Sequence, residues 1–270
     1  MFIANFFRNG AYAGEGTKNV AINRDGSITL GKGREPSLLG SVARIGEQPN
    51  SNFVGTAFGG GGYFEAVINF ETQDLTRPRQ SPTDADMWPA WWSMSAEHIV
   101  QRTDRAQWLL QQWGYEHFAE TDFFEALNGP KSYIVAIHDW YGIWNVTCPG
   151  YCHTLTPYSH NLVSAGEIDW RQPHKIAGRW IPATHTSRGS LAFFLDDRKV
   201  AEWSWSKFDD QLHTPPVMPD TPWRFGVIDQ QHLVLMINGG VKWPMTVHSI
   251  KVWQRDASKN ISRFPDAPFR

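Results

Sequence analysis

Three acidic side chains stand close together in the segment 119–126, which reads Ala-Glu-Thr-Asp-Phe-Phe-Glu-Ala. In a regular β-strand Glu120 and Asp122 share one face, whereas Glu125 points to the other because its offset is odd. A one-residue β-bulge at Phe123-Phe124 would return Glu125 to the face of the other two. Three converging carboxyl groups repel one another, so neighbouring members hold different protonation states at one pH.

That unequal protonation is what retaining glycoside hydrolysis requires. One ionised carboxylate attacks the anomeric carbon, and one protonated acid gives its proton to the leaving oxygen. The alternative, on the spacing alone, is a solvated strand face that carries ordinary surface acids.

The residues around this segment follow the period of β-strands. Gly62–Phe70 alternates Phe64, Ala66, Ile68 and Phe70 with more polar neighbours, which predicts a strand with one buried face. Similar patterns predict further strands at 132–138, 191–195, 200–205, 231–237 and 247–253, with a hairpin turn at 196–199.

One helix is expected among these strands. It covers about 96–113, where Ser95 caps the start and Gly114 the end. The stretches 75–89 and 148–173 are expected to be long loops. With no internal repeat or composition break, residues 1–270 are predicted to form one domain, an antiparallel β-sandwich of concave sheets with an inserted helix.

The composition excludes several classes of partner. The 270 residues carry 25 Lys and Arg against 27 Asp and Glu, a net charge of −2 without a long basic run, so neither nucleic acid nor an anionic membrane is expected. No apolar run approaches the roughly 18 residues that cross a bilayer. The 14 Trp suit both a core and a surface that stacks on sugar rings.

A short cysteine motif is a second possible feature, a zinc site. Cys148 and Cys152 are followed by His153 and His160, a wider histidine gap than structural zinc sites use. Two free thiols or a small local disulfide are favoured over zinc, and we expect no resident metal among the site residues.

The acid motif resembles the bulged E-x-D-x-x-E signature of glycoside hydrolase family sixteen, the group of laminarinases, lichenases, agarases and carrageenases. The resemblance extends in the same order along nearly the whole chain. Its further segments are Gly62-Tyr-Phe-Glu-Ala66, Trp88-Pro-Ala-Trp-Trp92, 176–182, 194–200 and 238–244.

The resemblance implies a concanavalin A-like jelly roll with a substrate groove on its concave sheet. It makes Glu120 the nucleophile, Asp122 the residue that orients and supports it, and Glu125 the general acid and base. Thr121 stands where the family has Ile, Leu or Val, and Asp197 stands in place of a turn glycine. The insertion before the acids leaves the substrate open.

Aromatic and polar residues near the acids are the candidates for binding sugars. Since side chains alternate, Trp91 and Trp92 cannot both face the groove. His138 could hydrogen-bond Asp122 or a sugar hydroxyl, or be a structural histidine. The predicted substrate-binding residues are Trp88, Trp92, His138, Trp140, Trp144 and Asn238.

The expected function is endo-acting, retaining hydrolysis of a β-linked polysaccharide, a β-1,3- or mixed-linkage glucan. The alternatives are a lectin-like binding module of the same fold and a hydrolase of agar- or carrageenan-type galactans. We expect a monomer without a cofactor, although a structural calcium ion is compatible with the fold. Because polymers do not cross membranes, we expect an extracellular or periplasmic enzyme whose export signal is absent from this chain.

Overall fold

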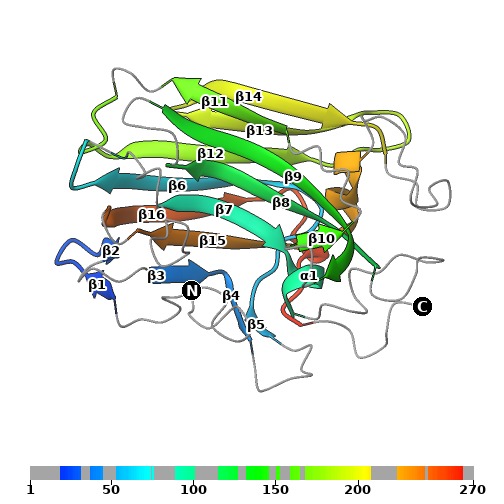
Figure 1. Ribbon diagram of the computed structural model, residues 1–270, viewed down its shortest axis with the longest axis horizontal. Coiled ribbons are helices and arrows are strands. Elements are labelled where there is room, and N and C mark those ends of the chain that lie inside the picture. Colours follow the sequence, from blue (N-terminus) through cyan, green and yellow to red (C-terminus); the bar gives the residue numbers. More distant parts are fainter. Residues whose placement is uncertain are drawn as a thin grey trace.

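The computed structural model describes residues 19–31, 37–44, 53–73, 75, 89–100, 115–126, 132–145, 150–152, 159–164, 168–207, 224–240 and 243–263. Within these ranges two large sheets, each of seven strands, pack face to face, and all of their strand pairs are antiparallel (Figure 1). The expected all-β sandwich of the jelly-roll kind is confirmed.

The first sheet, here called the site sheet, carries the acid motif. Its strands, in spatial order, are β10 (Gly150–Cys152), β9 (Ser132–Asn145), β8 (Tyr115–Glu125), β7 (Ala90–Ser95), β15 (Leu233–Gly239) and β3 (Ser37–Gly40), with β11 (Ser159–Ser164) also paired to β9.

The second sheet, here called the backing sheet, lies behind it in Figure 1. Its order is β1 (Val20–Ile22), β2 (Ile28–Leu30), β16 (Met245–Trp253), β6 (Gly62–Phe70), β12 (His174–Ile181), β13 (Gly189–Leu195) and β14 (Arg198–Trp205). The remaining elements are the strand pair β4 (Val42–Arg44) and β5 (Phe53–Gly55), the helix α1 (Ala96–Val100), and the 3-10 turns η2 (Arg224–Gln230) and η3 (Ala257–Lys259).

Aromatic side chains fill the space between the two sheets. Phe123 of β8 lies 6.1 Å from Phe64 and 6.2 Å from Phe193, ring centre to ring centre, and both partners belong to the backing sheet. Its neighbour Phe124 lies 5.8 Å from Phe70 of the same sheet. Two successive residues of one strand therefore both point into the core, which a regular strand does not allow.

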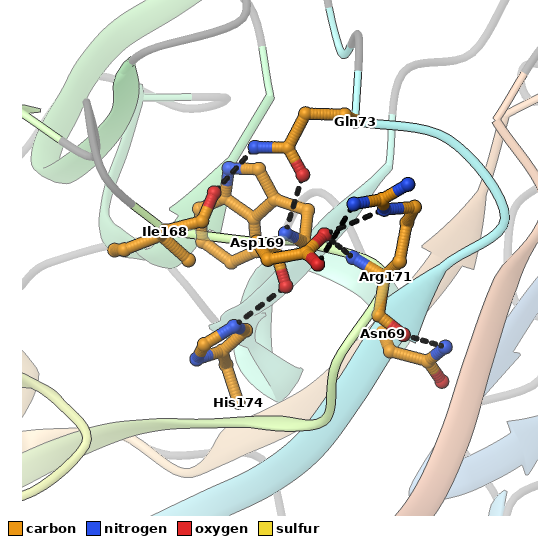
Figure 2. Close-up of polar contacts among 7 residues, drawn as sticks. Asn69, Gln73, Ile168, Asp169, Arg171 and His174 are labelled. Atoms are coloured by element: carbon orange, nitrogen blue, oxygen red, sulfur yellow. Dashed lines mark hydrogen bonds and ion pairs between the residues drawn. The ribbon is translucent and has the colours of Figure 1, made fainter.

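The loop before β12 packs against Phe124. Trp170 of this loop is buried and lies 5.3 Å from the Phe124 ring. Figure 2 shows how polar contacts fix the loop: the Gln73 side chain accepts a hydrogen bond of 2.8 Å from the Trp170 backbone and donates one to the Ile168 carbonyl. His174 contacts the Asp169 carbonyl at 3.0 Å. These bonds hold a bulky ring against the strand that carries the acids.

The predicted hairpin between β13 and β14 is confirmed. Asp196 and Asp197 take the left-handed backbone, with φ of 48° and 65°, which two-residue hairpin turns require. Asp197, predicted to stand in place of a turn glycine, therefore keeps the turn. The Asp197 carboxylate also contacts the Lys175 ammonium at 2.6 Å.

Other expectations need correction. The stretch 148–173 was expected to be a loop, yet it contains β10 and β11, which pair with β9. Such short edge strands depend on pairing with β9 more than on their own sequence. The strand β9 runs to Asn145, so His138 lies in its middle and not at the end of the strand predicted at 132–138. Asn238 lies on β15, just beyond the strand predicted at 231–237.

The predicted helix begins at Ala96 as expected, and 101–114 lies outside the described residues. The described part of the chain contains no helix that is long and apolar enough to span a membrane.

Candidate active site

The β-bulge predicted at Phe123-Phe124 is present. Along β9, Asp122 pairs with Ala136 and Glu125 with Ile134, so the two phenylalanines lie opposite one residue. On the other side, Phe124 and Asp122 pair with successive residues of β7, which leaves Phe123 without a partner there. Because both rings enter the core, Glu125 turns to the sheet face that carries Glu120 and Asp122.

The neighbouring strand β9 provides contacts to two of the acids. Nε1 of Trp140 donates a hydrogen bond of 2.7 Å to Oε2 of Glu120. Nε2 of His138 lies 2.9 Å from Oδ2 of Asp122. In the strand register His138 is directly opposite Glu120, so one histidine stands beside both carboxyl groups.

Burial dominates the electrostatics of the acids. Removal from water, followed by the charge of Asp122, raises the pKa of Glu120 to about 8, while His138 and the Trp140 N–H oppose this rise. Burial also raises the pKa of Asp122 to about 8. Two adjacent carboxyls do not both ionise readily, because the charge of one disfavours the charge of the other.

Glu125 completes the cluster. Ligand atoms of Asp122, Glu125 and His138 all lie within 4.8 Å of one another. The charge of Glu125 also contributes to the raised pKa of Glu120. The three acids thus interact, as the motif predicted, and the spacing of about 5–5.5 Å between the Glu120 and Glu125 carboxyls that retention requires stays a prediction.

Thr121 stands where the family that the acid motif resembles has Ile, Leu or Val. Its side chain points to the opposite side of β8 from the acids. Its hydroxyl lies 2.6 Å from the hydroxyl of Ser93 on β7, and both residues are fully buried. The polar side chain is therefore satisfied inside the sandwich, since each hydroxyl can donate to the other or accept from it. The departure leaves the acid-bearing face unchanged.

A row of stacked rings leads along this face to the acids. His98 of α1 stacks on Phe118 with ring centres 3.8 Å apart, and Phe118 and Trp140 stack at 6.4 Å. Trp140 in turn stacks on His138 at 5.7 Å. Trp140 and His138 are among the predicted site residues, whereas Phe118 is not, although it is two residues before Glu120 and so shares its face. No pattern in the sequence points to His98, because its contact with Phe118 depends on where α1 packs.

Trp92 and Asn238 differ from their predicted role. Both lie on the acid-bearing side of the site sheet, but they are only 5% and 3% exposed. Nε1 of Trp92 donates a hydrogen bond of 2.8 Å to Oδ1 of Asn238, which joins β7 to β15. They are packing groups of this face, and no open ring surface is left on Trp92 for a sugar. Trp88 and the side chain of Trp144 lie outside the described residues.

The strand pair β4–β5 explains why Trp92 is buried. Val42 and Phe53 of this pair join an apolar cluster with Trp92, Met94 and Met236. This cluster covers the β7–β15 part of the acid-bearing face. The acids, His138 and Trp140 lie beside it on β8 and β9, where His138 and Glu125 are partly exposed. A ligand can therefore approach the acids over β8 and β9.

No protein-family model matches the chain, and no curated protein is significantly similar to it. Among solved structures it is similar to porphyranase B from Zobellia galactanivorans, with a TM-score of 0.47 and 13% identity over 92% of this chain and 82% of that one. It is similar to an endo-1,3-beta-glucanase from Streptomyces sioyaensis, with a TM-score of 0.48 and 14% identity over 93% and 87%. A legume lectin-like domain from Entamoeba histolytica gives a TM-score of 0.43 and 6% identity over 88% and 87%. Likenesses of this strength assign neither a family nor an activity to the chain.

Proposed function

We propose that the chain is a retaining glycoside hydrolase that cuts a β-linked polysaccharide from within, as its resemblance to glycoside hydrolase family sixteen implies. The observation that carries this proposal is the bulge at Phe123-Phe124, which brings Glu125 to the face of Glu120 and Asp122. A binding module has no use for three crowded acids, because their mutual repulsion and desolvation cost stability.

In this proposal Glu120 is the nucleophile. Its carboxylate attacks the anomeric carbon, the bond from that carbon to the leaving oxygen breaks, and a covalent glycosyl ester forms on Glu120. The hydrogen bond from Trp140 fixes Oε2 and favours its ionised form. Asp122, which lies 2.9 Å from Nε2 of His138, orients the nucleophile.

Glu125 acts as general acid and then as general base. In the first step its proton passes to the leaving oxygen. In the second step it takes a proton from water, whose oxygen attacks the anomeric carbon and releases Glu120. Two displacements at one carbon return the original anomeric configuration.

The proposed substrate is a neutral β-1,3- or mixed-linkage glucan. The net charge of −2 favours a neutral over a sulfated polymer, and the ring row beside the acids suits the apolar faces of sugars. The enzyme would act outside the cytoplasm as a monomer without a cofactor, since two carboxyls suffice for this chemistry.

The test is reducing-sugar release from laminarin, lichenan, agarose and carrageenan in parallel, with the wild-type protein and its Glu125→Gln variant. We expect release from laminarin or lichenan by the wild type and its loss in the variant. Proton NMR of the fresh product should show the retained anomer. Release from agarose or carrageenan alone would exclude the glucan proposal, and binding without release would favour the lectin-like alternative.

A further inference from the structure

The side chains of Asp122, Glu125 and His138 combine two kinds of metal-binding atom. Each residue offers one donor, and the three donors lie within 4.8 Å of one another. They come from two adjacent strands, so the backbone hydrogen bonds of the β8–β9 pair fix their relative positions. A preformed set of this kind needs little rearrangement to hold an ion.

The burial of Asp122 and the contacts of its carboxylate favour a cation between the three side chains. The residue is 2% exposed, and its Oδ2 receives no hydrogen bond from the described residues although it lies 2.9 Å from Nε2 of His138. A buried oxygen of this kind is costly unless something compensates it. A bound cation would provide that compensation, and Glu125 and His138, both partly exposed, give it a way in from solvent.

The donor types select the ion. One imidazole and two carboxylates suit Zn²⁺, which accepts both nitrogen and oxygen ligands and leaves a fourth position for water. Mg²⁺ and Ca²⁺ prefer six or more oxygens, which this set does not supply. The partial burial of the site further disfavours Mg²⁺, which sheds its water reluctantly.

We propose that Asp122, Glu125 and His138 form a binding site for Zn²⁺, and that the bound ion inhibits the enzyme. The site itself follows from the three donors, while the inhibition rests on the proposed function. A Glu125 carboxylate that ligates Zn²⁺ is held in its ionised form and has no proton to give to the leaving oxygen, and the ion lies beside the nucleophile where the sugar would bind. Zn²⁺ is therefore an inhibitor here and not a cofactor.

Binding is tested directly by titrating the chelator-free protein with ZnCl₂ in a calorimeter, at one fixed pH. We expect one site in the wild type, binding at least about tenfold weaker in Glu125→Gln and His138→Gln, and no comparable heat from MgCl₂. The matched control is Glu120→Gln, which alters a neighbouring carboxyl that is not a ligand. It should keep the zinc affinity although it removes the proposed nucleophile. Circular dichroism of each variant checks that it is folded.

The outcomes separate this proposal from the proposed function. The protein could bind zinc through Glu125 and His138 and yet release no sugar from any polymer. That result would support the zinc site and refute the proposed hydrolase function. Hydrolysis with zinc binding that is absent, or equal in the wild type and both ligand variants, would overturn the zinc site alone. Binding that disappears in Cys148→Ser or Cys152→Ser instead would place the ion at the cysteine motif and also overturn it.

Discussion

Two aspartates, Asp122 buried and Asp229 partly buried, have opposite surroundings in this fold. Asp229, on η2, accepts hydrogen bonds from Nε1 of Trp180 at 2.8 Å, Nε1 of Trp205 at 2.7 Å and the backbone of Ala183 at 2.9 Å. Among the described residues, Asp122 on β8 has only the 2.9 Å contact between its Oδ2 and Nε2 of His138. The Asp229 carboxylate is surrounded by N–H donors, whereas the Asp122 carboxylate has little to offset its removal from water.

The difference shows in the electrostatics. Burial raises the pKa of both residues, but at Asp229 three hydrogen bonds oppose the rise. At Asp122 burial acts without such opposition and raises the pKa to about 8. The donors at Asp229 tie β12 and β14 of the backing sheet to η2, which is a structural task. A carboxyl held in an unfavourable site by the surrounding fold is instead typical of function.

The largest expected effect lies in the acid cluster of β8, which contains Asp122. Glu120→Ala should lower kcat by about 10³-fold or more, because it removes the group that forms the covalent bond. Added azide or formate should restore part of the turnover by filling the vacated space as an external nucleophile. The measurement is hydrolysis of the best substrate with and without azide. Asp229→Asn, assayed beside it, should keep near-normal turnover per folded molecule. Equal losses in both variants would remove the functional contrast between the two regions.

The second effect concerns the contribution of Asp229 to the stability of the fold. Asp229→Ala leaves two buried indole N–H groups and one amide without an acceptor and should lower the free energy of unfolding by about 3–5 kcal/mol. Urea unfolding followed by tryptophan fluorescence measures this loss. The control Asp229→Asn keeps one oxygen and should lose less. A loss below about 1 kcal/mol in Asp229→Ala would mean that water replaces the carboxylate easily.

The contrast also marks what sequence could predict. Strand period predicted the sandwich and the shared face of Glu120 and Asp122, because alternation along one strand is a local property. Alternation alone puts Glu125 on the other face, and the bulge that returns it was predicted from the bulged motif that the segment resembles. Asp229 contacts Trp180, which is 49 positions away, and Trp205, which is 24 positions away. No pattern within η2 predicts these contacts. Burial of Trp92 likewise depends on β4–β5, a distant segment. The contact of Trp140 with Glu120 was missed although both residues were named, since strand register was not available from the sequence.

A smaller effect is expected at Trp140, the hydrogen-bond donor of the acid cluster. Trp140→Phe keeps an aromatic ring but removes the N–H that stabilises ionised Glu120. Since Glu120 reacts in its ionised form, a further rise in its pKa should move the acid limb of kcat/KM to higher pH and lower kcat/KM about 10–100-fold at neutral pH. The pH profiles of both proteins test this. An unmoved acid limb with a raised KM would show that Trp140 only binds sugar.

The smallest expected effect, and the one with an unusual sign, is a gain of stability in Asp122→Asn. The carboxyl has an ordinary pKa near 3.8 when unfolded and about 8 when folded. Below pH 3.8 both states are neutral and the residue changes nothing. As the pH rises from there to about 8, only the unfolded state ionises, so the wild-type protein loses stability that an uncharged amide retains.

Thermal unfolding at pH 4 and pH 8 therefore distinguishes the two proteins. Asp122→Asn should match the wild type near pH 4 and be more stable at pH 8 by on the order of 1 kcal/mol, because the lost contact with His138 offsets part of the gain. Its kcat should fall, since the nucleophile loses its supporting neighbour. The same exchange at Asp229 should destabilise at both pH values, because the amide cannot accept from all three donors. A destabilised Asp122→Asn at pH 8 would show that His138 compensates Asp122 as fully as the two indoles compensate Asp229.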